Sequence, residues 1–122
     1  MGYKQLKDGN GGKEAMSMKI RVGWKEYEIV YKDIVICPDG VSKCYGNYSD
    51  EKQVIEICTA YSLAQQKATL LHELLHAIDA YHSLELTEET ISALTNALAE
   101  LEVNNPGLMG KIFKGNHGKK EA

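Results

Sequence analysis

The chain has 122 residues, of which 43% are hydrophobic and 25% charged, and its formal net charge is −3. This length and balance fit one compact domain with a modest core. A slightly acidic chain has no general attraction for nucleic acid or anionic lipid, and no apolar run approaches the ~20 residues that cross a bilayer.

The three cysteines, Cys37, Cys44 and Cys58, are an odd number, and no apolar stretch of a secretory signal follows the N-terminus. We therefore expect reduced thiols and a cytoplasmic location. None of the cysteines belongs to a Cys-x-x-Cys pair, so a structural zinc site at Cys37 and Cys44 is not favoured.

The two ends of the chain lack the apolar periodicity of its middle. Residues 1–17 include a Gly-rich run and read as a disordered leader. Residues 111–122 are basic and Gly-containing, and they read as a flexible tail. A single folded domain is therefore expected over residues 18–110.

Alternating apolar and polar residues between positions 19 and 31 predict half-buried strands, with a bulge or tight turn near Gly23. A Pro-Asp-Gly turn follows at residues 38–40. Residues 45–49 and 53–58 then read as the arms of a hairpin joined by a polar turn. These patterns predict a small antiparallel sheet in the N-terminal half.

The second half of the chain has helical periodicity. Ser62 and Gln65 form a Ser-x-x-Gln capping box, so a helix is expected from there to about His82. Thr87 opens a second helix, which the Asn-Asn-Pro-Gly sequence at residues 104–107 ends. The apolar stripe of this second helix is formed by Ile91, Leu94, Leu98 and Leu101. The predicted fold class is α+β.

The sequence His72-Glu73-Leu74-Leu75-His76 carries the chemistry. Residues four apart lie on the same helical face, so His72 and His76 can bind one metal ion from one side. Glu73 stands about 100° round the helix from His72, beside the metal, where it suits a general base. This pattern is typical of a catalytic Zn²⁺ site, because zinc lowers the pKa of its water to roughly 7.

A third protein ligand is expected, and three residues are candidates. Glu88 and Glu89 lie in the first turn of the second helix, and Glu88 is favoured because it borders the apolar stripe while Glu89 points away from it. His82 has the spacing of the metzincin third ligand, but Asp79 stands where that pattern has the Gly that ends the helix. In an unbroken helix His82 lies roughly 15 Å along the axis from His72.

Asp79 is also a candidate for an outer role. It lies on the face of the two histidines, one turn beyond His76, where a carboxylate can accept the spare N–H of a ligand imidazole. A solvent-exposed Asp is the alternative. For stabilising an oxyanion, the sequence offers Tyr48, Tyr81 and His117 without choosing among them.

Residues 18–106 resemble small zincin-like metallopeptidases of phages and mobile elements, related to the ImmA/IrrE type. The resemblance is carried by the Tyr-Gly-Asn-Tyr hairpin at residues 45–48, the strand at 54–57, the segment 68–79 around the two histidines, and residues 86–91. It implies a minimal zincin domain: a small sheet, an active-site helix and a following helix that supplies a Glu ligand.

The resemblance also implies zinc-dependent hydrolysis of a peptide or protein substrate, bound in extended form along an edge strand, for which residues 53–58 are the candidate. The alternatives are a non-catalytic interaction protein with a zinc-clamped fold and a hydrolase acting on another kind of substrate. Neither a nucleic-acid partner nor a membrane is expected.

Overall fold

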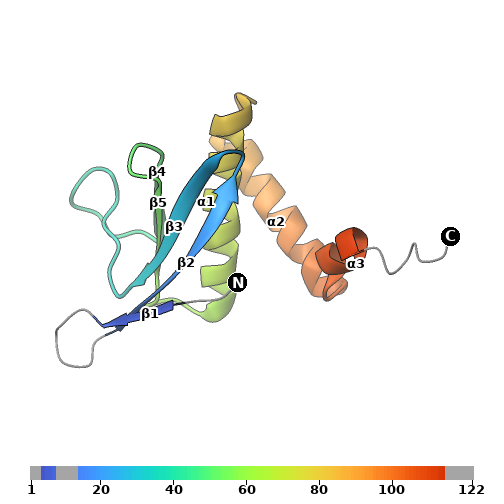
Figure 1. Ribbon diagram of the computed structural model, residues 1–122. Helices are drawn as coiled ribbons and strands as arrows, with labels where there is room; N and C mark the ends of the chain where they lie inside the picture. The colour runs from blue at the N-terminus through green and yellow to red at the C-terminus, as the bar shows by residue number, and fades with distance from the viewer. Residues whose placement is uncertain (1–3, 8–13, 115–122) are drawn as a thin grey trace, which may run out of the picture.

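The computed structural model describes residues 4–7 and 14–114, with side chains from residue 18 onward. One sheet packs against a long helix, and two further helices lead away from it (Figure 1). The strands are β1 (Lys4–Lys7), β2 (Glu14–Val22), β3 (Lys25–Lys32), β4 (Gly46–Ser49) and β5 (Val54–Cys58). The helices are α1 (Leu63–His82), α2 (Glu88–Asn104) and α3 (Leu108–Lys114). The predicted α+β class is confirmed.

The strand order is β1-β2-β3-β5-β4. The predicted hairpin is present, since β4 and β5 pair antiparallel, but β5 also pairs parallel with β3. The expectation of a purely antiparallel sheet was therefore wrong, and so was the assignment of residues 53–58 to the edge. The reason lies in the core: Ile55 and Ile57 on one face of β5 are completely buried, and the strand lies between β3 and β4. The edge strand on this side is β4.

The turn between β2 and β3 consists of two residues, with Val22 paired to Lys25. Gly23 has a φ of 64°, a conformation that strains other residues. A Cβ atom at this position would lie 2.1 Å from the Tyr81 ring, so only glycine lets the hairpin and the end of α1 approach each other. The expected tight turn at Gly23 is confirmed.

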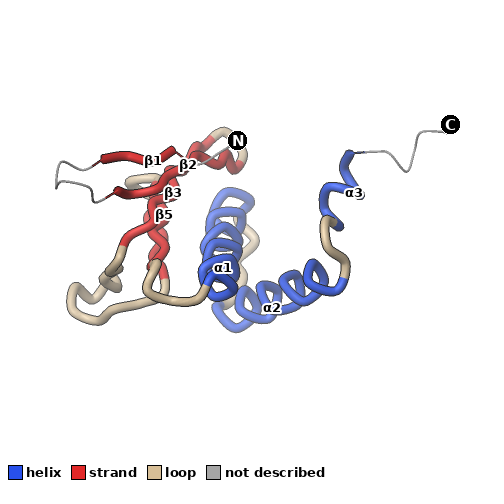
Figure 2. Tube along the Cα trace, turned by 90° about the horizontal axis from the view of Figure 1, so that it is seen from below, coloured by secondary structure: helices blue, strands red, loops and turns tan. Residues whose placement is uncertain are grey.

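The core lies between the sheet and one face of α1 (Figure 2). Tyr27, Ile29, Ile55 and Ile57 of the sheet are almost completely buried, and so is Ala77 of α1. Leu70, Leu74, Ile78 and Tyr81 of α1 pack against them. The spacing of these four residues marks one helical face, and the two histidines lie on another face, beside the edge strand β4.

Secondary structure extends into both predicted termini. Strand β1 and the start of β2 fall within residues 1–17, which the sequence assigned to a disordered leader, and α3 reaches into the predicted tail at 111–122. In residues 1–17, apolar and polar residues alternate too weakly to predict strands. Around α3, Gly107 and Gly110 interrupt the short run of apolar residues that would predict a helix. Residues 1–3, 8–13 and 115–122 lie outside the described part of the chain.

Helix α2 contacts α1 and then leads away from the sheet, and α3 packs on α2 (Figure 1). Within residues 4–7 and 14–114, every helix is too short or too polar to cross a membrane. The space beside α1 and the first turns of α2 contains the predicted site.

Candidate metal centre

His72 and His76 lie one turn apart on α1, outside the face that packs against the core of the sheet, and His76 lies beside Tyr48 of β4. Ser62 begins this helix by accepting a hydrogen bond from the backbone N–H of Gln65 at 3.1 Å. Both imidazoles are half-buried, and their ring centroids are 4.9 Å apart. Two of the predicted ligands are therefore placed together by the helix itself.

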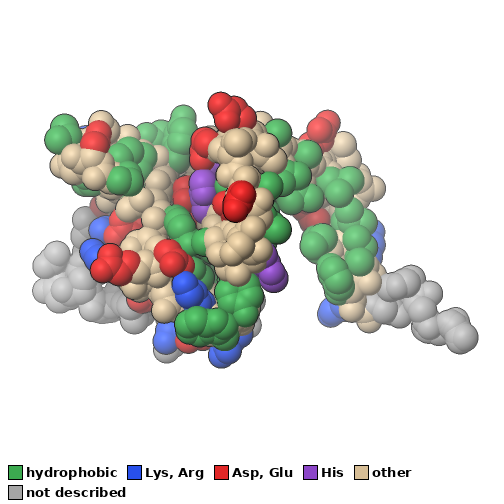
Figure 3. All heavy atoms as spheres, turned by 90° about the horizontal axis from the view of Figure 1, so that it is seen from above, with side chains coloured by type: hydrophobic (Ala, Val, Ile, Leu, Met, Phe, Trp, Pro, Cys, Tyr) green, Lys and Arg blue, Asp and Glu red, His purple; other side chains and the backbone are tan. Residues whose placement is uncertain are grey.

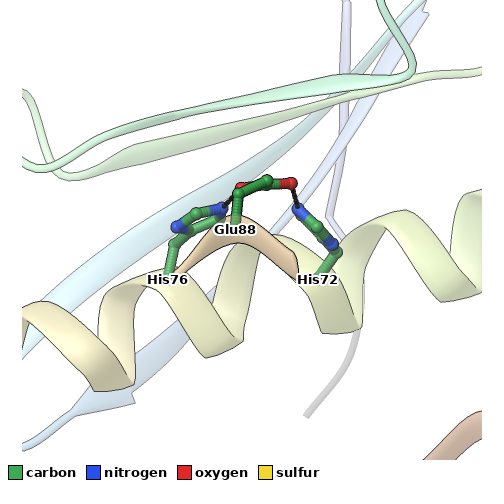
Figure 4. Close-up of side chains that lie close together, drawn as sticks. All are labelled: His72, His76 and Glu88. Atoms are coloured by element: carbon green, nitrogen blue, oxygen red, sulfur yellow. Dashed lines mark ion pairs between the residues drawn. The ribbon is translucent and has the colours of Figure 1, made fainter. Parts of the chain in front are cut away.

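Glu88, in the first turn of α2, lies between the two imidazoles (Figure 4). Its Oε2 is 2.9 Å from His72 Nε2, and its Oε1 is 3.0 Å from His76 Nε2. One ligand atom from each of these three residues lies within 4.8 Å of the others. Among the described residues, the group includes neither Glu89 nor His82.

His82 is too far along α1 to join the group. The helix runs unbroken from Leu63 to His82 and ends at Ser83, which adopts the left-handed conformation with a φ of 53°. Because nothing interrupts the helix at Asp79, His82 remains roughly 15 Å along the axis from His72. The structure thus follows the arrangement expected without the metzincin glycine.

The short connection between α1 and α2 brings Glu88 to the histidines. Asp79 accepts hydrogen bonds there through two atoms: its backbone oxygen from the N–H groups of Ser83 and Leu84, and its Oδ1 from the N–H of Leu86 at 3.0 Å. Thr87 then caps α2 by accepting from the N–H of Thr90 at 3.1 Å.

The predicted contact of Asp79 with a ligand imidazole is not among the hydrogen bonds of the described residues. Its side chain accepts the Leu86 N–H instead, because the chain reverses direction directly above it. Asp79 therefore supports the site indirectly, because it holds the segment that leads into the first turn of α2, where Glu88 lies.

Thr95, which the sequence reading missed, contacts the other nitrogen of His72. Its Oγ1 lies 3.4 Å from His72 Nδ1 and donates its own proton to the backbone oxygen of Ile91 at 2.9 Å. With that proton committed, the hydroxyl oxygen is available to accept a hydrogen from Nδ1, and the tautomer that carries this hydrogen is the one in which Nε2 can bind a metal ion. Thr95 is buried, and a polar residue seven positions after Glu88 in an apolar stripe was the available signal.

Glu73 lies beside the three converging side chains. Burial raises the pKa of its carboxyl above the ordinary value, whereas the neighbouring imidazoles of His72 and His76 lower it and the Glu88 carboxylate raises it further. A carboxyl in such surroundings holds a proton more readily than one in water.

A cavity of about 410 Å³ opens in front of this group, in the size range of small-molecule and side-chain sites. Its walls come from α1, α2 and the start of β4. The lining residues are Cys44, Tyr45, Gly46, Gln65, Ala68, Thr69, His72, Glu73, Glu88, Ser92, Thr95 and Asn96. A Cβ on Gly46 would lie 2.5 Å from the Thr69 side chain, so glycine allows β4 to pass close to α1.

Neither tyrosine considered for oxyanion stabilisation lines this cavity. The Tyr48 ring stacks on His76 with centroids 6.1 Å apart, and its hydroxyl donates to Asp50 at 3.1 Å. Tyr81 packs in the core beside Gly23. His117 lies outside the described residues. Tyr45 is the tyrosine in the cavity wall.

Two imidazole nitrogens and one carboxylate form a donor set that fits a divalent transition metal ion. The residues can hold such an ion because their donor atoms already converge and Nε2 of His72 is oriented from behind by Thr95. The sequence matches no described protein family, and no curated protein or solved structure is significantly similar to it. The resemblance to zincin-like peptidases accordingly stays a prediction.

Proposed function

We propose that the protein is a zinc-dependent peptidase of the zincin type, in which His72, His76 and Glu88 hold the ion. The observation that carries this proposal is the convergence of these three side chains beside Glu73 at the wall of an open cavity. Three protein ligands are typical of catalytic zinc, whereas structural zinc is closed by four. When bound, zinc lowers the pKa of water and polarises a carbonyl.

Glu73 acts as the general base and acid. Its carboxylate takes a proton from the attacking water and passes it to the nitrogen of the leaving amine, which requires a carboxyl that binds and releases a proton easily. The half-buried position of Glu73 beside the ligands meets that requirement.

The substrate peptide pairs with β4. This strand is hydrogen-bonded to β5 on one side only, and the segment that begins it lines the cavity. An extended peptide can add itself to such an edge through backbone hydrogen bonds. The edge strand is β4 rather than residues 53–58, so the scissile bond lies between β4 and the start of α2.

Three variants test the proposal by metal content and by hydrolysis of a peptide library. His72→Ala loses zinc. Glu73→Gln keeps zinc but lowers peptide hydrolysis by at least about a thousandfold, because it removes the proton carrier and no ligand. Glu89→Gln, a change of the same kind at the residue next to Glu88 but outside the group, alters neither property.

Two results would contradict the proposal. Equal loss of zinc in His72→Ala and Glu73→Gln would remove Glu73 from the role of base. A zinc-loaded wild-type protein that cleaves no peptide of the library would favour a zinc-clamped interaction protein instead.

A further inference from the structure

The part of the chain from Leu94 to the end of α3, which we call the arm, exposes an unusual amount of apolar surface. The exposed fraction of its large side chains runs from 38% at Leu98 to 77% at Phe113. The exposed set comprises Leu94, Leu98, Leu101, Val103, Met109, Ile112 and Phe113. Exposed apolar surface of this extent often marks an interface.

The apolar residues of the arm follow helical spacing. Leu94, Leu98 and Leu101 lie at positions i, i+4 and i+7 of α2, so they form one stripe. In α3, Ile112 and Phe113 share a face, while Lys111 and Lys114 occupy the opposite one. Two amphipathic faces therefore meet at the bend between α2 and α3.

Nothing in the described part of the chain covers these faces. Helix α3 packs on α2 alone. Figure 2 shows α2 leading away from α1 and α3 turning at its far end, and Figure 3 shows hydrophobic side chains along the hollow between α3 and α1. Residues 115–122 of the sequence contain no large apolar side chain that would fill this hollow.

We propose that the arm is a dimerisation surface whose occupant is the arm of a second copy of this chain. The arm offers both an apolar hollow and a short helix with an exposed apolar face, so one copy supplies what the other lacks. Complete burial of its exposed apolar side chains would remove at most roughly 700 Å² per copy, or roughly 1,400 Å² in total, which is within the range of stable interfaces.

The charges of the arm suit this pairing. Glu100 and Glu102 make the last turns of α2 acidic, whereas Lys111 and Lys114 make α3 basic. A two-fold axis that places α3 of one copy along α2 of the other brings the basic helix beside the acidic one at both ends of the interface. Glu88 lies at the other end of α2, so the pairing leaves the metal centre open.

The mass of the full chain in solution tests the proposal. Sedimentation velocity or light scattering is expected to give twice the 13.6 kDa of one chain. Ile112→Asp with Phe113→Asp raises the dimer dissociation constant at least about a hundredfold, because the symmetry counts each lost contact twice. Phe113→Ser alone raises the dimer dissociation constant by a smaller factor, and it replaces the double variant in the test if that variant fails to fold.

Val41→Asp is the matched control, because Val41 is equally exposed, at 82%, but lies in the loop before β4. This variant stays dimeric. A wild-type protein that is monomeric at all concentrations overturns the proposal. A dimer that survives the arm variants also overturns it, as do open-ended oligomers. Circular dichroism and zinc content verify that the variants are folded.

Discussion

Helix α1 and the α2–α3 region are built in different ways. The first is held along one whole face by the sheet, where Ile29, Ile55 and Ala77 are fully buried. The second touches the rest of the chain mainly through the first turns of α2, and only Ile91 and Thr95 of that helix are buried. The candidate metal centre lies at the junction, with two of its side chains from the well-packed helix and one from the other.

The three side chains of the candidate site are positioned in two ways. His72 and His76 are set by helical geometry and by a core that holds the helix still. Glu88 is 62% exposed, and its place depends on the connection held by Asp79 and on the cap at Thr87. Preorganisation of the site therefore depends on contacts between the two regions.

Removing the carboxylate that α2 contributes should have the largest effect on zinc affinity. Glu88→Ala is expected to raise the dissociation constant for zinc at least about a hundredfold, equivalent to about 2.7 kcal/mol, because two imidazoles alone hold the ion poorly. Competition with a chromophoric chelator at neutral pH measures this. Glu89→Ala and His82→Ala are the controls, and a larger loss in His82→Ala would identify the histidine as the third ligand.

Removing the hydroxyl that joins α2 to His72 should have an intermediate effect. Thr95→Val keeps the shape of the side chain but leaves Nδ1–H without its acceptor, and a loss of about tenfold in zinc affinity is expected. Nitrogen NMR of the imidazoles should show the change at His72 and none at His76.

Two variants decide whether this effect belongs to the hydrogen bond. Thr95→Ser, which keeps the hydroxyl, restores the affinity. Thr69→Val removes an equally buried hydroxyl of α1 whose partner is Gln65 rather than an imidazole, and it should leave zinc binding unchanged. An equal loss in Thr69→Val would attribute the effect to packing.

The smallest effect is expected on the folding stability, from the contacts of Asp50 with the sheet. Hydrogen bonds from Tyr27 at 2.6 Å and from Lys25 at 3.0 Å lower the pKa of this carboxyl below its ordinary value. A lowered folded-state pKa means that the stabilisation is complete above the unfolded value of about 3.9 and is lost as the pH falls through the folded value. Asp50 is nearly half exposed, so the loss stays below about 1 kcal/mol.

Urea unfolding between neutral pH and about pH 2.5 measures this contribution as the difference between wild type and Asp50→Asn. The difference should shrink as the pH falls. Glu51→Gln, a change at the exposed neighbouring carboxylate, should run parallel to wild type at every pH. A difference for Asp50→Asn that grows towards low pH would contradict the assigned sign.

Much of the fold could be read from local patterns. The Ser62 cap, the two-residue turn at Gly23 and the hairpin of β4 and β5 are each specified by neighbouring residues, so the sequence predicted them correctly. The parallel pairing of β3 with β5 could not be read in this way. This pairing depends on which strand of the hairpin, β4 or β5, lies beside β3. Burial against α1 decides between them.

The same distinction between local pattern and tertiary packing applies to the candidate site. Helical geometry alone predicts that His72 and His76 share one face of a helix, with Glu73 beside them, because an α-helix fixes the relation between residues four apart. Packing of the two helices brings Glu88 into the group, places Thr95 beside His72, and turns Asp79 towards the connection instead of an imidazole. These contacts join residues on two helices, and their relative placement follows from packing and from a short turn that no local periodicity encodes.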